Sequence, residues 1–201
     1  MSAPPPLRLA CLVSGGGRSV MNLQDRIERG ELPARIELVL ATRPNVAAIQ
    51  RASARGLSVA EIPPSPRETL DDRVDAALGA AGTDLVVLAG YLRLFRVRSW
   101  QGRCINIHPA LLPRHGGKGL WGHHVHEAVL AAGDRESGCT VHWVDEQYDH
   151  GRTILQRRCP VLPDDTPDAL GSRVFAEELE ALPEAIRRIA SGSANLVQAS
   201  G

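Results

Sequence analysis

The sequence has no excess of charge of either sign. Its 201 residues include 23 Lys or Arg and 23 Asp or Glu, which gives a formal net charge of +0. A protein that binds nucleic acid normally shows a clear basic excess or a basic run, and neither is present. We therefore expect no nucleic-acid partner.

Long apolar runs and paired cysteines are also missing. No segment approaches the roughly 20 apolar residues of a membrane span, and the amino-terminal run MSAPPP has no signal-peptide stretch. The four cysteines include no Cys-x-x-Cys pair, which argues against a cysteine-based metal or redox centre. We predict a cytoplasmic protein with no membrane partner and with buried, reduced thiols.

The first half of the chain alternates short apolar runs with longer amphipathic stretches. With a hydrophobic content of 43%, the chain can bury a sizeable core, as one domain or two closely joined halves. Strand, helix and strand in alternation predict parallel strands with right-handed crossovers. The expected buried strands are 7–13, 36–40, 57–62 and 85–88, and the expected helices are 20–29, 46–55 and 67–81.

The second half predicts a change of sheet direction. A strand at 104–108 leads into a loop rich in Gly and His at 109–124 and a helix at 125–132. Strands at 139–144 and 153–161 can pair as neighbours, and a last helix should run from Thr166-Pro167-Asp168 to about 191. The predicted fold class is α/β: a single Rossmann-like domain, a mostly parallel sheet with a mixed edge, and helices on both faces.

The most informative motif is Asn106-Ile107-His108-Pro109, followed later by Asp149 in a turn. Residues two apart on a strand leave the same face, so Asn106 and His108 can converge on one reacting atom. Pro109 favours extended backbone at His108. An amide, an imidazole and a carboxylate can stabilise an oxyanion and transfer protons, so we interpret these residues as a catalytic set. Because a nearby carboxylate favours the imidazolium, we expect Asp149 to keep His108 protonated.

The segment Ser14-Gly15-Gly16-Gly17-Arg18-Ser19 follows the first strand and precedes the first helix. Its glycines and the helix amino terminus predict a phosphate-binding loop. A dinucleotide fingerprint is disfavoured because Val20 stands at the third glycine position, although Arg43 leaves an NADP enzyme open.

All seven histidines lie between residues 108 and 150, which raises a metal-site alternative. His123 and His126 would lie one helical turn apart, with Asp149 as an oxygen ligand. The chain has no H-E-x-x-H motif and no third ligand at a recognised spacing. We therefore predict no metal.

Three segments carry a resemblance to a known family. They are the run Cys104-Ile-Asn-Ile-His-Pro-Ala-Leu-Leu-Pro113, the segment Leu88-Ala-Gly-Tyr-Leu-Arg93, and Gly138-Cys-Thr-Val-His-Trp-Val144 through Asp149 to Gln156. Over about residues 8 to 190 the chain resembles the phosphoribosylglycinamide formyltransferases of de novo purine biosynthesis. The resemblance implies formyl transfer from 10-formyltetrahydrofolate, the co-substrate, to the amine of glycinamide ribonucleotide (5-phosphoribosylglycinamide). The implied partners are these small molecules, and the implied assembly is a monomer or homodimer.

The resemblance also implies roles for individual residues and a division of the chain. Asn106, His108 and Asp149 match the catalytic residues, and Arg67 matches a folate-contacting Arg. The substrate-binding matches are Gly15, Gly16, Gly17, Arg18, Ser19 and Glu178, and the other folate-binding matches are Leu92, Arg93, Leu94, Phe95 and Tyr148. The implied formyltransferase domain is 8–191, with a phosphate-binding half at 8–100 and a folate-binding, catalytic half at 101–191. A flexible segment at 1–7 and a tail at 192–201 complete the chain.

Three departures from the family pattern keep alternatives open. The glycine-rich loop is longer than the common form, the segment 116–126 is expanded, and Phe175 replaces a polar substrate contact of some relatives. The alternatives are a formyltransferase acting on another phosphorylated or sugar amine, a folate- or nucleotide-binding regulator, and an NADP oxidoreductase.

Overall fold

The computed structural model describes residues 5–194. Of the predicted flexible segment 1–7, residues 1–4 lie outside this range and Leu7 begins the first strand. Of the predicted tail, residues 195–201 lie outside it, and the last helix ends at Ala190. The division into two halves stays a prediction.

Within residues 5–194, seven strands form one sheet in the order β3-β2-β1-β4-β5-β6-β7. The pairs among the first five strands are parallel, whereas β6 pairs antiparallel with both β5 and β7. The mostly parallel sheet with a mixed edge is therefore confirmed. The strands are β1 (Leu7–Val13), β2 (Ala34–Ala41), β3 (Val59–Glu61), β4 (Leu85–Leu88), β5 (Cys104–His108), β6 (Glu136–Trp143) and β7 (Thr153–Pro160).

Helices cover both faces of the sheet, as predicted, but unequally. Alternate residues of β1 belong to two separate apolar clusters, because successive side chains leave opposite faces. One cluster takes residues from four helices and the other from α3 and the short 3-10 helix Arg98–Trp100, which the sequence reasoning missed. The helices are α1 (Arg18–Glu28), α2 (Ala47–Ala54), α3 (Leu70–Ala80), α4 (His123–Ala131) and α5 (Pro167–Ala190).

The prediction of a buried strand at 57–62 was wrong. The observed β3 has only three residues, and Val59 and Glu61 are exposed. It pairs with β2 alone and lies at the edge of the sheet, where one side has no neighbouring strand. The four cysteines are buried and free, as predicted.

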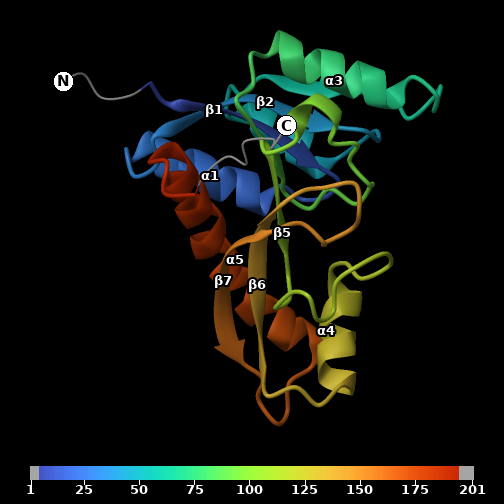
Figure 1. Ribbon diagram of the computed structural model, residues 1–201, viewed down its shortest axis with the longest axis vertical. Helices are drawn as coiled ribbons and strands as arrows, with labels where there is room; N and C mark the ends of the chain where they lie inside the picture. The colour runs from blue at the N-terminus through green and yellow to red at the C-terminus, as the bar shows by residue number, and fades with distance from the viewer. Residues whose placement is uncertain (1–4, 195–201) are drawn as a thin grey trace, which may run out of the picture.

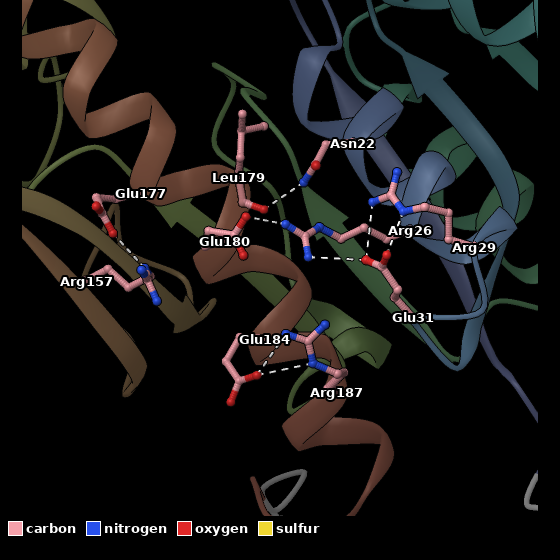
Figure 2. Close-up of polar contacts among 10 residues, drawn as sticks. All are labelled: Asn22, Arg26, Arg29, Glu31, Arg157, Glu177, Leu179, Glu180, Glu184 and Arg187. Carbon is pink, nitrogen blue, oxygen red and sulfur yellow. Dashed lines mark hydrogen bonds and ion pairs between the residues drawn. The ribbon is translucent and has the colours of Figure 1, made fainter.

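The long helix α5, the orange-to-red ribbon in Figure 1, extends from the antiparallel strands β6 and β7 to α1. It packs against β6, β7 and α4, and it also contacts α1. Figure 2 shows polar contacts of α5 on both sides: Glu177 pairs with Arg157 of β7, and Leu179 and Glu180 contact α1. In residues 5–194, no helix has the length and apolar character needed to cross a membrane.

Candidate active site

One large cavity, of about 760 Å³, lies at the carboxyl ends of β1, β4 and β5. Its walls are the glycine-rich loop after β1, the segment 88–95 after β4, the loop after β5, the turn with Asp149, and one face of α5. Ligand sites of open α/β sheets lie at this end of the strands. The predicted Asn106, His108 and Asp149 all line it.

Strand β5 presents Asn106 and His108 on the same face, as their spacing predicted. Asn106 Nδ2 lies 3.2 Å from Asp149 Oδ1, and His108 Nδ1 lies 3.4 Å from Asp149 Oδ2. Ile105 and Ile107 point to the opposite face and belong to the apolar core. The three polar side chains therefore converge inside the cavity.

The turn after β6 brings Asp149 to this position. Asp149 has a positive φ of 53°, a conformation that Asp tolerates better than most residues and that is often found at functional sites. Its Oδ2 also accepts a hydrogen bond from Gly117 N at 3.0 Å. Gly151 makes the turn possible, because a Cβ there would lie 1.9 Å from the carbonyl oxygen of Trp143.

His142 is a site residue that the sequence reasoning missed. It lies on β6 directly opposite Asn106 and is almost fully buried. Its Nδ1 donates to the Trp143 carbonyl at 2.8 Å, and its Nε2 lies 3.1 Å from Asn106 Nδ2 and 3.6 Å from Asp149 Oδ1. The signal was present in the clustering of histidines, but the pairing of β5 with β6 was needed to place His142 beside Asn106.

His108 carries opposing electrostatic influences. Burial lowers its pKa, the Asp149 carboxylate raises it, and burial prevails, so the pKa of His108 lies below its ordinary value. We expected Asp149 to keep His108 protonated, and the structure corrects that expectation. His108 Nε2 donates to the carbonyl of His115 at 2.8 Å, and the His115 ring is held by Asp134 at 2.7 Å.

Asp149 is ionised at neutral pH. Burial by itself would raise its pKa, but the contacts with His142, His108 and the Gly117 N–H together outweigh burial and bring the pKa below its ordinary value. The carboxylate is therefore available as an acceptor for protons and for hydrogen bonds within the cavity.

The loop after β1 exposes backbone amides to the cavity. Gly17 precedes α1 with a positive φ of 74°, and a Cβ there would lie 2.5 Å from Ala48 Cβ, so only glycine fits. No side chain caps α1, which leaves the N–H groups of its first turn available to an anion. Arg43 and Arg51 donate to carbonyls of the same loop, so Arg43 supports the loop instead of reaching for a ligand.

Two residues of α5, Phe175 and Glu178, lie opposite this loop. The guanidinium of Arg18 lies 3.8 Å from the centre of the Phe175 ring, a cation–π contact. Burial raises the pKa of Glu178 to about 8, and nearby Arg18 opposes the rise. Glu178 is therefore mostly protonated at neutral pH. Gly15, Gly16 and Ser19 also line the cavity, and their role in substrate binding stays a prediction.

The residues predicted to bind folate lie mostly on the segment after β4, with Tyr148 next to Asp149. Leu92, Arg93, Leu94, Phe95 and Tyr148 all line the cavity. Leu92 and Tyr148 are exposed for apolar side chains, at 42% and 38%. The predicted Arg67 is different: it is exposed, precedes α3, and does not line the cavity.

The loop after β5 is held by a second group that the sequence reasoning missed. Thr140 Oγ1 donates to the Ala110 carbonyl at 2.6 Å and accepts from Leu112 N at 3.0 Å. Gln156 Nε2 donates to the Leu112 carbonyl at 2.8 Å. Both residues come from the antiparallel strands, which thereby fix the backbone just after His108.

The histidines of α4 do not surround a common point. His123 contacts Asp168 and Glu127, while His126 is buried against Gly171 of α5, where a Cβ would lie 2.9 Å from the ring. Within residues 5–194, no group of three or more His, Cys, Asp or Glu side chains could hold a metal ion.

Comparison with known proteins gives a consistent result. Residues 7–186 match the family model described as formyl transferase. Glycinamide ribonucleotide transformylase 1 of Symbiobacterium toebii has 35% sequence identity and a TM-score of 0.88, with 94% of this chain and 90% of that chain covered. The phosphoribosylglycinamide formyltransferase of Brucella melitensis has 33% identity and a TM-score of 0.85, with 93% and 97% covered.

Two curated relatives are longer proteins. The chloroplastic phosphoribosylglycinamide formyltransferase of Arabidopsis thaliana is 39% identical over 194 residues, which are 92% of this chain and 66% of the relative. The trifunctional purine biosynthetic protein adenosine-3 of Drosophila melanogaster is 40% identical over 195 residues, which are 93% of this chain and 14% of the relative. The chain thus spans less than two thirds of the length of either relative.

Proposed function

The chain belongs to the formyl transferase family, and we propose that it transfers the formyl group of 10-formyltetrahydrofolate to the amine of 5-phosphoribosylglycinamide. The observation that carries this proposal is the convergence of Asn106 and His108 on the Asp149 carboxylate, at 3.2 and 3.4 Å, in a single cavity. The names of the similar proteins from Symbiobacterium toebii and Arabidopsis thaliana support the choice of acceptor.

In the proposed reaction, the acceptor nitrogen attacks the formyl carbon on N10 of the folate. A C–N bond forms, the formyl oxygen becomes an oxyanion, and Asn106 and His108 stabilise its charge. Asp149 accepts a proton from the attacking amine, directly or through water, because it is ionised at neutral pH. Collapse of the tetrahedral intermediate breaks the bond to N10, which takes up the proton that the amine gave to Asp149, and the formamide is released.

The protonation of His108 is coupled to this charge. Burial disfavours the imidazolium, but its two ring nitrogens face the Asp149 carboxylate and the His115 carbonyl, which are both acceptors. A developing oxyanion adds a further negative charge and shifts the balance towards the imidazolium. We therefore infer that His108 gains its proton as the tetrahedral intermediate forms.

The two ends of the cavity suit the two substrates. A phosphate fits the uncapped amino terminus of α1, where backbone amides and Arg18 supply positive charge. A folate ring system fits the opposite end, because it would cover the exposed apolar surfaces of Leu92 and Tyr148. The cavity of about 760 Å³ lies within the range of roughly 300–1,000 Å³ that is usual for ligand sites.

The direct test is turnover of purified protein with glycinamide ribonucleotide and 10-formyltetrahydrofolate, followed by the absorbance of the deformylated folate. We expect turnover that His108→Ala lowers at least about a hundredfold. Circular dichroism should show that the variant is folded. Folded wild-type protein that binds the folate but releases no formylated product would refute the proposed acceptor.

A formyltransferase acting on another phosphorylated or sugar amine is the second candidate. The observation in its favour is Phe175, an aromatic residue on the wall where some relatives have a polar contact with the substrate. Comparing kcat/KM for glycinamide ribonucleotide with that for other phosphorylated amines decides between the two.

Cytoplasmic location and a monomeric or homodimeric state remain predictions. Light scattering on the purified protein tests the oligomeric state.

A further inference from the structure

Three residues of α1, spaced four apart, contact α5 in succession. Arg18 stacks on Phe175, Asn22 donates to the carbonyl of Leu179 at 2.7 Å, and Arg26 pairs with Glu180. Residues four apart lie on one face of a helix, so these contacts form a ladder between the two helices. Figure 2 shows the second and third contacts, with Glu31 also bound to Arg26.

The middle contact replaces a hydrogen bond that α5 cannot make within itself. The carbonyl of Leu179 would normally accept from the N–H of residue 183, but that residue is Pro183, which has no N–H. The side chain of Asn22 supplies the donor from α1, and the contact is partly buried. An unsatisfied carbonyl in such a position is costly, so the proline makes α5 depend on Asn22.

The same turn of α5 faces the cavity. Leu179 directly follows Glu178, and the first contact of the ladder, Arg18 on Phe175, is itself part of the cavity wall. The ladder therefore links the glycine-rich loop, at the start of α1, to the side chain of Glu178. Under the proposed function both line the site of the acceptor, whose phosphate binds at the loop.

We propose that Asn22 is a positioning residue, which sets the register of α5 against α1. This register in turn sets the distance between the phosphate-binding loop and Glu178. This inference rests on the proposed function. It predicts that Asn22 affects the kinetics only of an acceptor that carries its phosphate, because an acceptor without phosphate does not bind at the loop.

The first experiment measures how much the hydrogen bond from Asn22 to the Leu179 carbonyl contributes to the free energy of unfolding, and it needs no enzyme assay. The unfolding of wild type, Asn22→Ala, Pro183→Ala and the double variant is followed in urea. Asn22→Ala should lower the folding constant about tenfold, or about 1.4 kcal/mol, because the Leu179 carbonyl loses its donor. In the Pro183→Ala background, residue 183 supplies an N–H, so the same change should cost less than about twofold. Pro183→Ala and the double variant both lack the contacts of the proline ring, so this loss cancels when the two are compared.

The second experiment measures kinetics with two acceptors, glycinamide ribonucleotide and the same compound without its phosphate. Asn22→Ala should raise the KM for the ribonucleotide about tenfold. A misplacement of 1 Å can cost roughly a hundredfold in rate, and we expect a smaller effect here because the contacts of Arg18 and Arg26 with α5 remain. The KM for folate and kcat/KM for the dephosphorylated acceptor should stay within about twofold of wild type. Gln24→Ala is the matched control, since Gln24 also lies on α1 but its side-chain amide bonds to Glu28 of the same helix and not to α5.

The outcomes separate the possible failures. An equal effect of Asn22→Ala in both backgrounds of the urea cycle would overturn the Asn22–Leu179 contact. Equal losses with both acceptors would overturn the positioning role while leaving the proposed function intact. Absence of ribonucleotide turnover by the wild type would instead overturn the proposed function and the positioning role, and the urea cycle would still accept or reject the contact itself.

Discussion

Replacing Asn106 by alanine removes one of the two groups that we expect to stabilise the oxyanion. Loss of such a donor typically costs about 2.7–4 kcal/mol, or roughly a hundred- to thousandfold in kcat. In this structure Asn106 Nδ2 already contacts His142 Nε2 and Asp149 Oδ1, at 3.1 and 3.2 Å. One of these bonds has to be given up when the oxyanion forms, so we expect a loss near the lower end, about a hundredfold.

The same structure bounds the effect of Asn106→Ala on folding. Asp149 keeps its bond from Gly117 N, and the cavity admits water to the neighbours of the lost amide. We therefore expect a destabilisation of about 1 kcal/mol, which lowers the Tm of a chain of this size by about 2–4 °C. A loss of activity well below that Tm is then a loss of chemistry.

The assay is steady-state kinetics with both substrates, together with a folate titration. The KM for folate should stay within about threefold of wild type, because uniform binding is not removed. Gln101→Ala serves as control, since Gln101 is an exposed carboxamide that does not line the cavity. A kcat of Asn106→Ala within about threefold of wild type would show that the amide does not stabilise the oxyanion.

Three further predictions follow from the electrostatics of the site. Asp149→Asn removes the attraction that raises the pKa of His108, so the decline of kcat/KM at high pH should begin at lower pH, and an unchanged pH profile would count against this role. The pKa of Glu178 is raised to about 8 in the folded protein, so the folded state loses stability as the pH rises from about 4.5 towards 8. Glu178→Gln cannot ionise, so the difference in stability between pH 5 and pH 8.5, measured by urea titration, should be smaller than in wild type. Asp134→Ala frees the His115 ring and should lower kcat about fivefold, with little change in folate binding measured by titration.

The sequence was sufficient for local structure but not for edges and registers. The two-residue spacing of Asn106 and His108 predicted their common face, because the strand period depends only on the backbone. The exposure of β3 could not be predicted in this way, since an apolar run does not tell whether a second strand lies beside it. His142 was missed for a related reason: its place opposite Asn106 depends on the antiparallel register of β6, which no local pattern specifies.

The same limit applies to charge. A nearby carboxylate suggested that His108 would be protonated, and that inference was wrong because the sequence does not give the burial that opposes it. Arg43 was open as a ligand for a phosphate, but the structure places its guanidinium on the Ser14 carbonyl. Both residues show that the type of a side chain predicts its chemistry only when its neighbours and its access to water are known.

The two carboxyl groups of the cavity hold opposite protonation states at neutral pH. Contacts with His142, His108 and Gly117 overcome burial at Asp149 and keep it ionised, whereas Glu178 has Arg18 as its main opposing influence and burial prevails. Environments that separate the pKa values of two acids in this way assign them different tasks. The ionised acid is the one beside Asn106 and His108, where a proton has to be accepted. The protonated acid lies across the cavity near the phosphate-binding loop, where a second negative charge would repel the acceptor's phosphate.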